Sequence, residues 1–155
     1  MMNKYYESIE GQLFVDPILA NHVGLTEITK ERFDQIIADR NKPTTDQLLQ
    51  QLMQARKEQE HQGVTINVIR YAGDPSNRQA IAEAMQFMAD AGTTEFPVWK
   101  DSDDVFHVDH PLTDVVDAYR AIGVRRVQLI AAEGQYATQV VDGSLTEVTG
   151  LTWPQ

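Results

Sequence analysis

Apolar residues recur every three or four positions over four stretches of the chain, the spacing that places them on one face of an α-helix. These stretches predict helices over residues 30–40, 46–62, 75–90 and 113–142. Between them, short runs alternate apolar and polar residues, which is typical of β-strands. The pattern therefore predicts an α+β fold. Its order is a small N-terminal hairpin and short helix, then a helix, short strands, a helix, a β-hairpin and a long C-terminal helix.

Polar residues and glycines mark the ends of these helices. Thr29, one of residues 44–46, and either Asp74 or Ser76 can cap a helix N-terminus, because their side-chain oxygens accept hydrogen bonds from free backbone amides. Gly63 follows the second helix, where a glycine accommodates the backbone turn that ends a helix.

Residues 41–43, Asn-Lys-Pro, divide the chain in two, because proline disfavours helix in the residue before it and is accepted in the first turn of the next helix. We expect residues 1–41 to form a small N-terminal docking unit, in which a turn at Gly11 joins two short strands ahead of one helix. Its apolar residues make only a marginal core, so it must pack on the rest of the chain or dock on a partner. Residues 44–155 form the α+β domain.

The faces of two helices predict what each can bury. The second half of the 46–62 helix, RKEQEHQ, is polar on all sides, and we expect it to project into solvent or meet a neighbouring subunit. In the long helix, Gly123 and Gly134 interrupt one apolar stripe and mark close helix contact or a kink. That stripe consists of Leu112, Val116, Tyr119, Ile122, Val127, Ile130, Ala137 and Val141. The tail 144–155 is apolar enough that we expect it to dock.

The stretch 95–110, EFPVWKDSDDVFHVDH, predicts a β-hairpin with an acidic turn. Carboxylate and imidazole groups are ligands for Zn, Mn or Fe. An alternative metal site therefore comprises Asp101, Asp103, Asp104, His107 and His110, with Asp109 beside them. On a strand, His107 and His110 are three residues apart and point to opposite faces, which does not suit joint coordination unless a loop at Asp109 reorients them. We expect no metal and no cofactor, and an acidic cluster that forms turn hydrogen bonds through its own side chains.

Charge and composition narrow the range of partners. The 155 residues carry a formal charge of −10, which repels phosphate backbones and anionic lipid, so nucleic acid is a poor partner. There are no cysteines, which excludes disulfides and thiolate catalysis. No apolar run reaches the roughly 18–20 residues of a membrane span, and the first residues lack the apolar segment of a signal peptide. We therefore expect a chain that neither spans a membrane nor is exported by the common route.

Motifs of known catalytic sites are also missing. The sequence contains no G-x-S-x-G elbow, no G-x-x-x-x-G-K-[ST] loop and no G-x-G-x-x-G turn, so we expect no enzyme activity. Arg125 and Arg126 are interpreted as a salt-bridging surface pair. Two alternatives stay open at the 95–110 hairpin. One is a metal-dependent hydrolase, and the other is a host-glycan binding module that stacks sugars on Trp99, Phe106 and Tyr71.

Protein–protein contact is the remaining class of function. Large aromatic and aliphatic side chains are typical anchors of interfaces. The candidate interface residues are Tyr5, Tyr6, Phe14, Leu48, Leu52, Met53, Trp99 and Trp153. We expect the N-terminal hairpin, the helix that carries Leu48, Leu52 and Met53, and the tip of the 95–110 hairpin to be docking surfaces.

Four segments together resemble a domain of unknown function found in tailed bacteriophages, in tail-fibre, tail-fibre-assembly and other tail-associated proteins. They are GVTINVIRYAGDPSNRQAIAEAM (63–85), FPVWKDSDDVFHVDHP (96–111), RRVQLIAAEGQYATQV (125–140) and LTWP (151–154). The resemblance covers about residues 44–155. The N-terminal unit, with Tyr5-Tyr6 and Ile28-Thr29 before a helix, separately resembles the N-terminus of phage tail-fibre assembly proteins.

The resemblance implies a role in the virion or its assembly and brings no catalytic residue. We accordingly expect a tail-associated structural protein that docks on a tail fibre or another tail component, as a homo-oligomer or in a symmetric multi-copy assembly. It would occupy the host cytoplasm during assembly and then the virion tail. The alternative within the same setting is a tail-fibre assembly chaperone that is absent from the mature virion.

Overall fold

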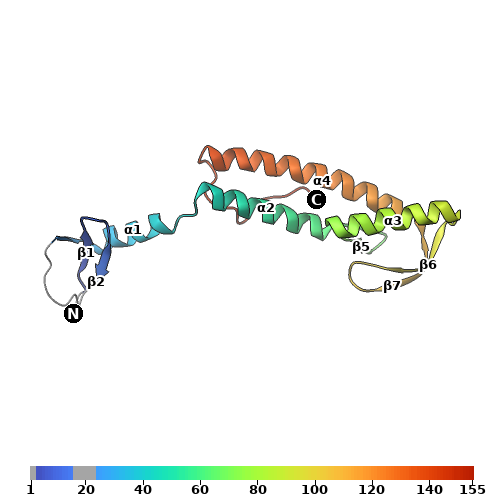
Figure 1. The fold of residues 1–155 in the computed structure, drawn as a ribbon, viewed down its shortest axis with the longest axis horizontal. Coiled ribbons are helices and arrows are strands. Elements are labelled where there is room, and N and C mark those ends of the chain that lie inside the picture. Colours follow the sequence, from blue (N-terminus) through green and yellow to red (C-terminus); the bar gives the residue numbers. More distant parts are fainter. Residues whose placement is uncertain (1–2, 16–23) are drawn as a thin grey trace. The chain divides into compact units, whose positions relative to one another are not determined.

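The computed structural model describes residues 3–15 and 24–155, and the chain divides into two compact units, Met1–Pro43 and Thr44–Gln155 (Figure 1). The described residues form helices and short antiparallel strands in both units. The predicted α+β class is therefore confirmed.

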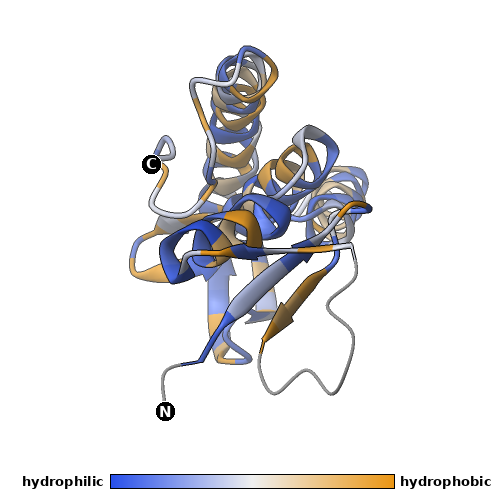
Figure 2. Cartoon of the chain, turned by 90° about the vertical axis from the view of Figure 1, so that its left-hand side faces the viewer, coloured by the Kyte–Doolittle hydropathy of each residue, from blue (hydrophilic) through white to orange (hydrophobic). Residues whose placement is uncertain are grey.

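The first unit is a three-stranded antiparallel sheet followed by one helix. Strands β1 (Tyr5–Ser8), β2 (Leu13–Val15) and β3 (Leu25–Ile28) are arranged in the order β2-β1-β3, and α1 spans Lys30–Asn41. In Figure 2, β2 is coloured as hydrophobic, whereas the tyrosine-rich β1 is paler. Glycine at position 11 has a φ of 79° in the turn between β1 and β2, a value that L side chains rarely adopt.

The predicted two-stranded hairpin of this unit is incomplete, because β3 pairs with the free edge of β1. The sequence of β3, LTEI, has apolar residues only at its two ends and lacks the alternation that identifies a strand. The predicted helix cap is confirmed: the Thr29 hydroxyl accepts a hydrogen bond from the Arg32 amide at 3.1 Å. The helix contacts the sheet through Phe33, whose ring centre lies 4.9 Å from that of Tyr5.

The second unit contains three helices and two β-hairpins. They are α2 (Thr45–Gln62), β4 (Val64–Ile66), β5 (Ile69–Tyr71), α3 (Pro75–Ala91), β6 (Glu95–Lys100), β7 (Phe106–Pro111) and α4 (Leu112–Val141). The two hairpins form separate two-stranded sheets, β4-β5 and β6-β7.

Most predicted helix ends are confirmed. Thr44 and Gln47 form a capping box at the start of α2, with reciprocal hydrogen bonds of 3.2 and 2.8 Å. The Asp74 carboxylate accepts hydrogen bonds from two amides in the first turn of α3. Gly63 ends α2, and Gly92 ends α3 in the left-handed conformation.

Helix α4 runs antiparallel to α2 and also packs on α3, so α2 and α3 lie end to end along it (Figure 1). Two groups of apolar side chains fill the contacts. One group lies where α3, α4 and the hairpins meet, and consists of Tyr71, Ile81, Met88, Phe96, Val115, Ala118 and Ile122. The other lies between α2, α4 and the C-terminal segment, and consists of Leu52, Leu129 and Trp153.

The apolar stripe predicted from spacing is not the main buried side of α4, although Leu112 and Ala137 of that stripe pack against the two core clusters. The buried residues are Val115, Ala118, Ile122, Arg125, Leu129 and Val140, and of the predicted stripe only Ile122 is among them. Tyr119, Val127, Ile130 and Val141 are 37%, 67%, 42% and 69% exposed. The reason is that α4 has apolar residues on two sides, and spacing alone does not identify the side that meets a neighbour.

The C-terminal segment packs on α4, as predicted. Trp153 is buried, its ring centre lies 5.6 Å from that of Tyr136, and the Tyr136 hydroxyl donates to the Thr152 carbonyl at 2.6 Å. Among the described residues, no helix is long and apolar enough to cross a membrane.

Candidate functional site

The inner face of hairpin β6–β7 holds a cluster of rings against β5. The ring centre of Trp99 lies 5.0 Å from that of Phe96 and 5.7 Å from that of His110. His110 is buried, and its Nε2 shares a hydrogen bond of 2.6 Å with the hydroxyl of Tyr71, which is 1% exposed. The cluster therefore fastens the hairpin to the core through both ring packing and one buried polar contact.

The expectation that His107 and His110 point to opposite faces is wrong. Their ring centres are 6.0 Å apart on the same side of the hairpin. The residue between them in the strand, Asp109, has a φ of 50°, which is outside the β region and interrupts the alternation of side chains. The opposite strand departs in the same way, because Phe96 and Trp99 are also three residues apart and in contact.

Although the two histidines meet, the carboxylates of the turn do not converge on them. The Asp101 carboxylate contacts His107 Nε2 at 2.8 Å, whereas Asp103 binds Arg70 at 2.8 Å and Asp104 pairs with Lys100. Over residues 3–15 and 24–155, no group of three or more potential ligands is placed to hold a metal ion. The alternative site of Asp101, Asp103, Asp104, His107 and His110 is thus not assembled.

Asp101 instead organises the turn, which is the role expected for the acidic cluster. One of its carboxylate oxygens accepts hydrogen bonds from the amides of Asp103 and Val105, at 2.8 and 2.9 Å. This is the Asx-type contact by which aspartate stabilises turns. The His107 contact on the other oxygen, together with these amides, holds the pKa of Asp101 below its usual value.

The tip of the hairpin is bound to β5 through Ser102. The Arg70 guanidinium donates to the Ser102 carbonyl at 2.7 Å, and the Ser102 hydroxyl accepts a hydrogen bond from the Ala72 amide at 2.8 Å. The Ser102 amide in turn donates to the Arg70 carbonyl at 3.2 Å.

Burial keeps the Tyr71–His110 pair neutral at neutral pH. Burial, with a smaller effect of the nearby Asp114 and Asp101 charges, raises the pKa of Tyr71 to about 12. Burial also lowers the pKa of His110, because an imidazolium ion loses its hydration there. The Tyr71 hydroxyl and His110 Nε2 are occupied by each other.

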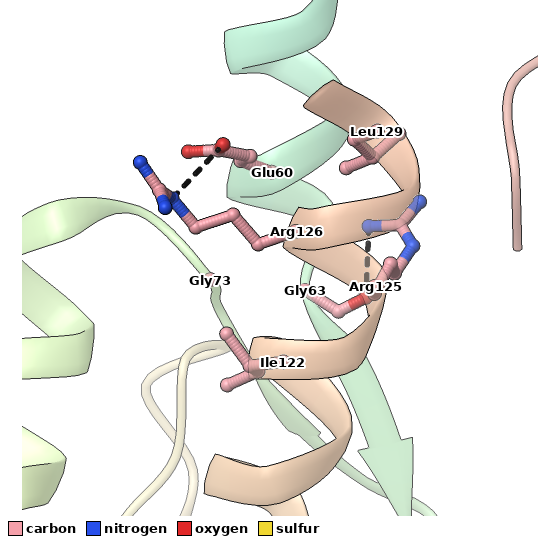
Figure 3. Close-up of a pocket in the computed structure, with 7 residues that line it drawn as sticks. All are labelled: Glu60, Gly63, Gly73, Ile122, Arg125, Arg126 and Leu129. Carbon is pink, nitrogen blue, oxygen red and sulfur yellow. Dashed lines mark hydrogen bonds and ion pairs between the residues drawn. The ribbon is translucent and has the colours of Figure 1, made fainter. Parts of the chain in front are cut away.

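A second polar cluster lies where α2, α3 and α4 meet, around the buried carboxylate of Glu60 (Figure 3). Glu60 pairs with Arg56 at 2.6 Å on α2, with Arg78 at 3.3 Å on α3 and with Arg126 at 3.4 Å on α4. Arg56 also pairs with Glu133 of α4. The expectation that the polar half of α2 is solvated holds for Lys57, Glu58, His61 and Gln62, which are exposed. It is wrong for Arg56 and Glu60, whose charges are paired with groups of α3 and α4.

Two glycines let the backbone approach this cluster closely. The Glu60 carbonyl accepts hydrogen bonds from the amides of Gly63 and Gly73, both at 3.0 Å. A Cβ atom at Gly73 would lie 2.5 Å from that carbonyl oxygen, and one at Gly63 would lie 1.8 Å from the Tyr71 carbonyl oxygen. Any other residue at either position would displace the connection between α2, β4–β5 and α3.

Arg125 and Arg126 have different roles. Arg126 forms the predicted ion pair, with Glu60, but Arg125 is buried and not on the surface. Its guanidinium donates to the carbonyls of Gln59 and Gly63, at the C-terminal end of α2. The space between these groups, shown in Figure 3, is about 10 Å³, roughly the room of one water molecule. The cluster is thus a junction of the fold with no room for a larger ligand.

The sequence alone contained one sign of this junction. Arg56 and Glu60 are four residues apart on a helix, a spacing that favours an ion pair. The other partners of Glu60 are 18 and 66 residues away in the chain, beyond the range of any local pattern.

The predicted interface residues separate into two groups. Tyr6, Leu48, Leu52 and Trp153 are buried, so they belong to the core and present no surface to a partner in this fold. Met53 is 40% exposed, and Tyr5, Phe14 and Trp99 are partly exposed. The predicted sugar-stacking platform is not brought together either, because Tyr71 is buried whereas Phe106 is exposed.

Exposed apolar side chains gather instead on the outward face of hairpin β6–β7. Val98 and Val108 are opposite each other in the register, and they are 55% and 74% exposed. Phe106 is 67% exposed, with the Lys100 ammonium 5.9 Å from its ring centre. Of these residues, the sequence singled out only Phe106, because the break in alternation at Asp109 hides which side of each strand faces out.

Comparison with known families gives one match. The family described as "Domain of unknown function (DUF4376)" matches residues 43–150. Comparisons with curated proteins and with solved structures found no match.

Proposed function

We propose that this chain, which belongs to the DUF4376 family of domains of unknown function, is a tail-associated structural protein of a bacteriophage that docks on a tail fibre or another tail component. The support for the phage setting is the resemblance of four of its segments to a domain of tail-associated proteins. The support for docking is the apolar outward face of hairpin β6–β7.

The hairpin face is the observation that carries the proposal. Its inner side already fastens it to the core, so Val98, Phe106 and Val108 are not needed to hold the hairpin in place. Three large apolar side chains on one face of an acidic protein favour contact with another protein. Contact with nucleic acid is disfavoured by the charge of −10.

The proposal is tested by the composition of purified phage particles. Mass spectrometry should find the chain in a fixed ratio to the tail proteins. Absence from particles, together with fibres that fail to assemble when the gene is deleted, would replace this proposal by an assembly chaperone. Absence from particles with normal fibres would reject both.

A surface variant tests the docking face itself. Phe106→Ser combined with Val108→Thr should abolish incorporation into particles while leaving the melting temperature of the purified protein nearly unchanged. Phe87→Ser on α3, where the side chain is 69% exposed, is the matched control and should be incorporated normally. Equal incorporation of both variants would show that the hairpin face is not the docking surface.

A further inference from the structure

The outward side of α4 carries a second apolar surface that no residue of the second unit covers. We define the outer stripe as Tyr119, Gly123, Val127, Ile130, Gly134 and Val141. Its large side chains are 37–69% exposed. Successive positions are three, four or seven residues apart, which is about one or two helical turns, so the stripe stays on one side of α4.

The two glycines of the stripe have no role within one copy of the chain. A Cβ atom added at Gly123 or Gly134 would meet nothing within 4 Å. A glycine within a helix also lowers its stability relative to alanine. The two glycines leave two hollows beside the projecting side chains of Tyr119 and Ile130.

The large and small residues of the stripe are complementary to those of a second copy that runs antiparallel to the first. In an antiparallel pair with its two-fold axis between positions 126 and 127, Tyr119 of one copy faces Gly134 of the other. Ile130 likewise faces Gly123, and each contact occurs twice by symmetry, as a two-fold interface requires. A parallel pair would set glycine against glycine and leave both hollows empty.

The charges that border the stripe are compatible with a second copy. Arg126 is paired with Glu60, Glu133 with Arg56, and Arg120 with Asp117 at 3.5 Å, all within one chain. The stripe itself contains no charged residue. The charged side chains beside the stripe therefore already have partners in their own chain, so two copies can meet here although each has a charge of −10.

The length of α4 sets the expected strength. Thirty residues span about 45 Å, and packed helices are about 10 Å apart, so each copy covers on the order of 450 Å². The total of about 900 Å² is below the roughly 1,200 Å² at which stable interfaces begin and is in the range of weak, transient contacts. We propose that the outer stripe of α4 binds the outer stripe of a second copy of this chain, antiparallel, in a concentration-dependent homodimer.

Cysteine cross-linking tests the register, because the natural chain contains no cysteine. Val127→Cys lies beside the two-fold axis and should give a disulfide-linked dimer on mild oxidation. Val141→Cys places the two sulfurs tens of ångströms apart and should not, whereas a parallel pair would link it. Gln128→Cys, on another side of α4, is the control that should stay monomeric. Linking of Val141→Cys, or equal linking of Val127→Cys and Gln128→Cys, would overturn the proposal.

A steric variant tests the hollows. Sedimentation of the unmodified chain should show its mass rise from 17.5 kDa to about twice that value with concentration. Gly134→Leu should keep the fold but remain monomeric, because the new side chain meets Tyr119 of the other copy. Adding Tyr119→Ala should restore the dimer. A chain that is monomeric at all concentrations, or a Gly134→Leu variant that still dimerises, would contradict the inference. Neither result depends on whether the protein is found in phage particles.

Discussion

The two sides of α4 differ in how their residues are used. The side against α2 and α3 includes a charged residue, Arg125, and yet it is buried. The outward side carries Val127 and Ile130, which are exposed. Burial on this helix therefore follows from what the neighbouring helix offers. The C-terminal end of α2 presents backbone carbonyls that Arg125 can bind, and no element of the unit reaches the outward side.

The largest expected effect comes from the charge at the centre of the buried side. Glu60→Ala leaves Arg56, Arg78 and Arg126 without their common carboxylate, and losing one partner of a buried ion pair costs about 3–5 kcal/mol. Urea unfolding should show this loss. Glu58→Ala, at an exposed position of the same helix, is the control and should change stability by less than about 0.5 kcal/mol. Equal losses for the two variants would mean that the cluster does not stabilise the fold.

Adjacent residues of α4 compare the two sides directly. Leu129 is fully buried, so Leu129→Ala should destabilise the protein by about 2–4 kcal/mol. Ile130→Ala, measured at a concentration low enough to keep the chain monomeric, should cost less than about 1 kcal/mol because the side chain is 42% exposed. Thermal unfolding of the two variants side by side is the measurement. A larger loss for Ile130→Ala would reverse the assignment of the two sides.

Two glycines, one in a crowded place and one on the outward side of α4, allow the same comparison of buried and open surroundings. Gly73→Ala forces a Cβ against the Glu60 carbonyl and should destabilise the fold by about 1–3 kcal/mol. Gly123→Ala adds its Cβ in open space and should stabilise the monomer by up to about 1 kcal/mol. Gly73→Ala should lower the melting temperature and Gly123→Ala should raise it. Shifts of the same sign would show that the space around one of the two glycines is described incorrectly.

The smallest effect concerns pH. The folded-state pKa of His110 is lower than its unfolded value near 6.5, so the unfolded chain binds the proton more tightly. Stability from this residue is complete above about pH 6.5 and is lost as the pH falls through the folded-state pKa. His110→Gln should remove this part of the pH dependence between pH 7 and 5. His61→Gln, at an exposed site, should retain it. The same slope in both variants would exclude His110 as its source.

Local rules predicted much of the fold, because caps and turns depend on residues close in sequence. Thr44 and Asp74 begin helices and Gly63 ends one, as expected from their side chains alone. The sequence left open that Asp109 reorients His107 and His110, but it did not decide whether this happens, because aspartate also occurs in ordinary strands and turns without a positive φ.

The junction around Glu60 was beyond sequence reasoning for another reason. Its stabilising partners come from three helices, and a charged stretch such as RKEQEHQ has the same pattern whether water or arginines surround it. The sequence therefore predicted where the candidate site lies, at the hairpin turn organised by Asp101. It did not predict which side chains of the site are accessible.

The continuous course of α4 along both α2 and α3 has a mechanical consequence. The connection between α2 and α3 passes through two hairpin strands and glycines, and by itself it could bend. Because one unbroken helix of about 45 Å spans the connection, a force applied at β6–β7 is carried as shear along α4 towards the segment around Trp153. We therefore expect the second unit to resist bending at this connection.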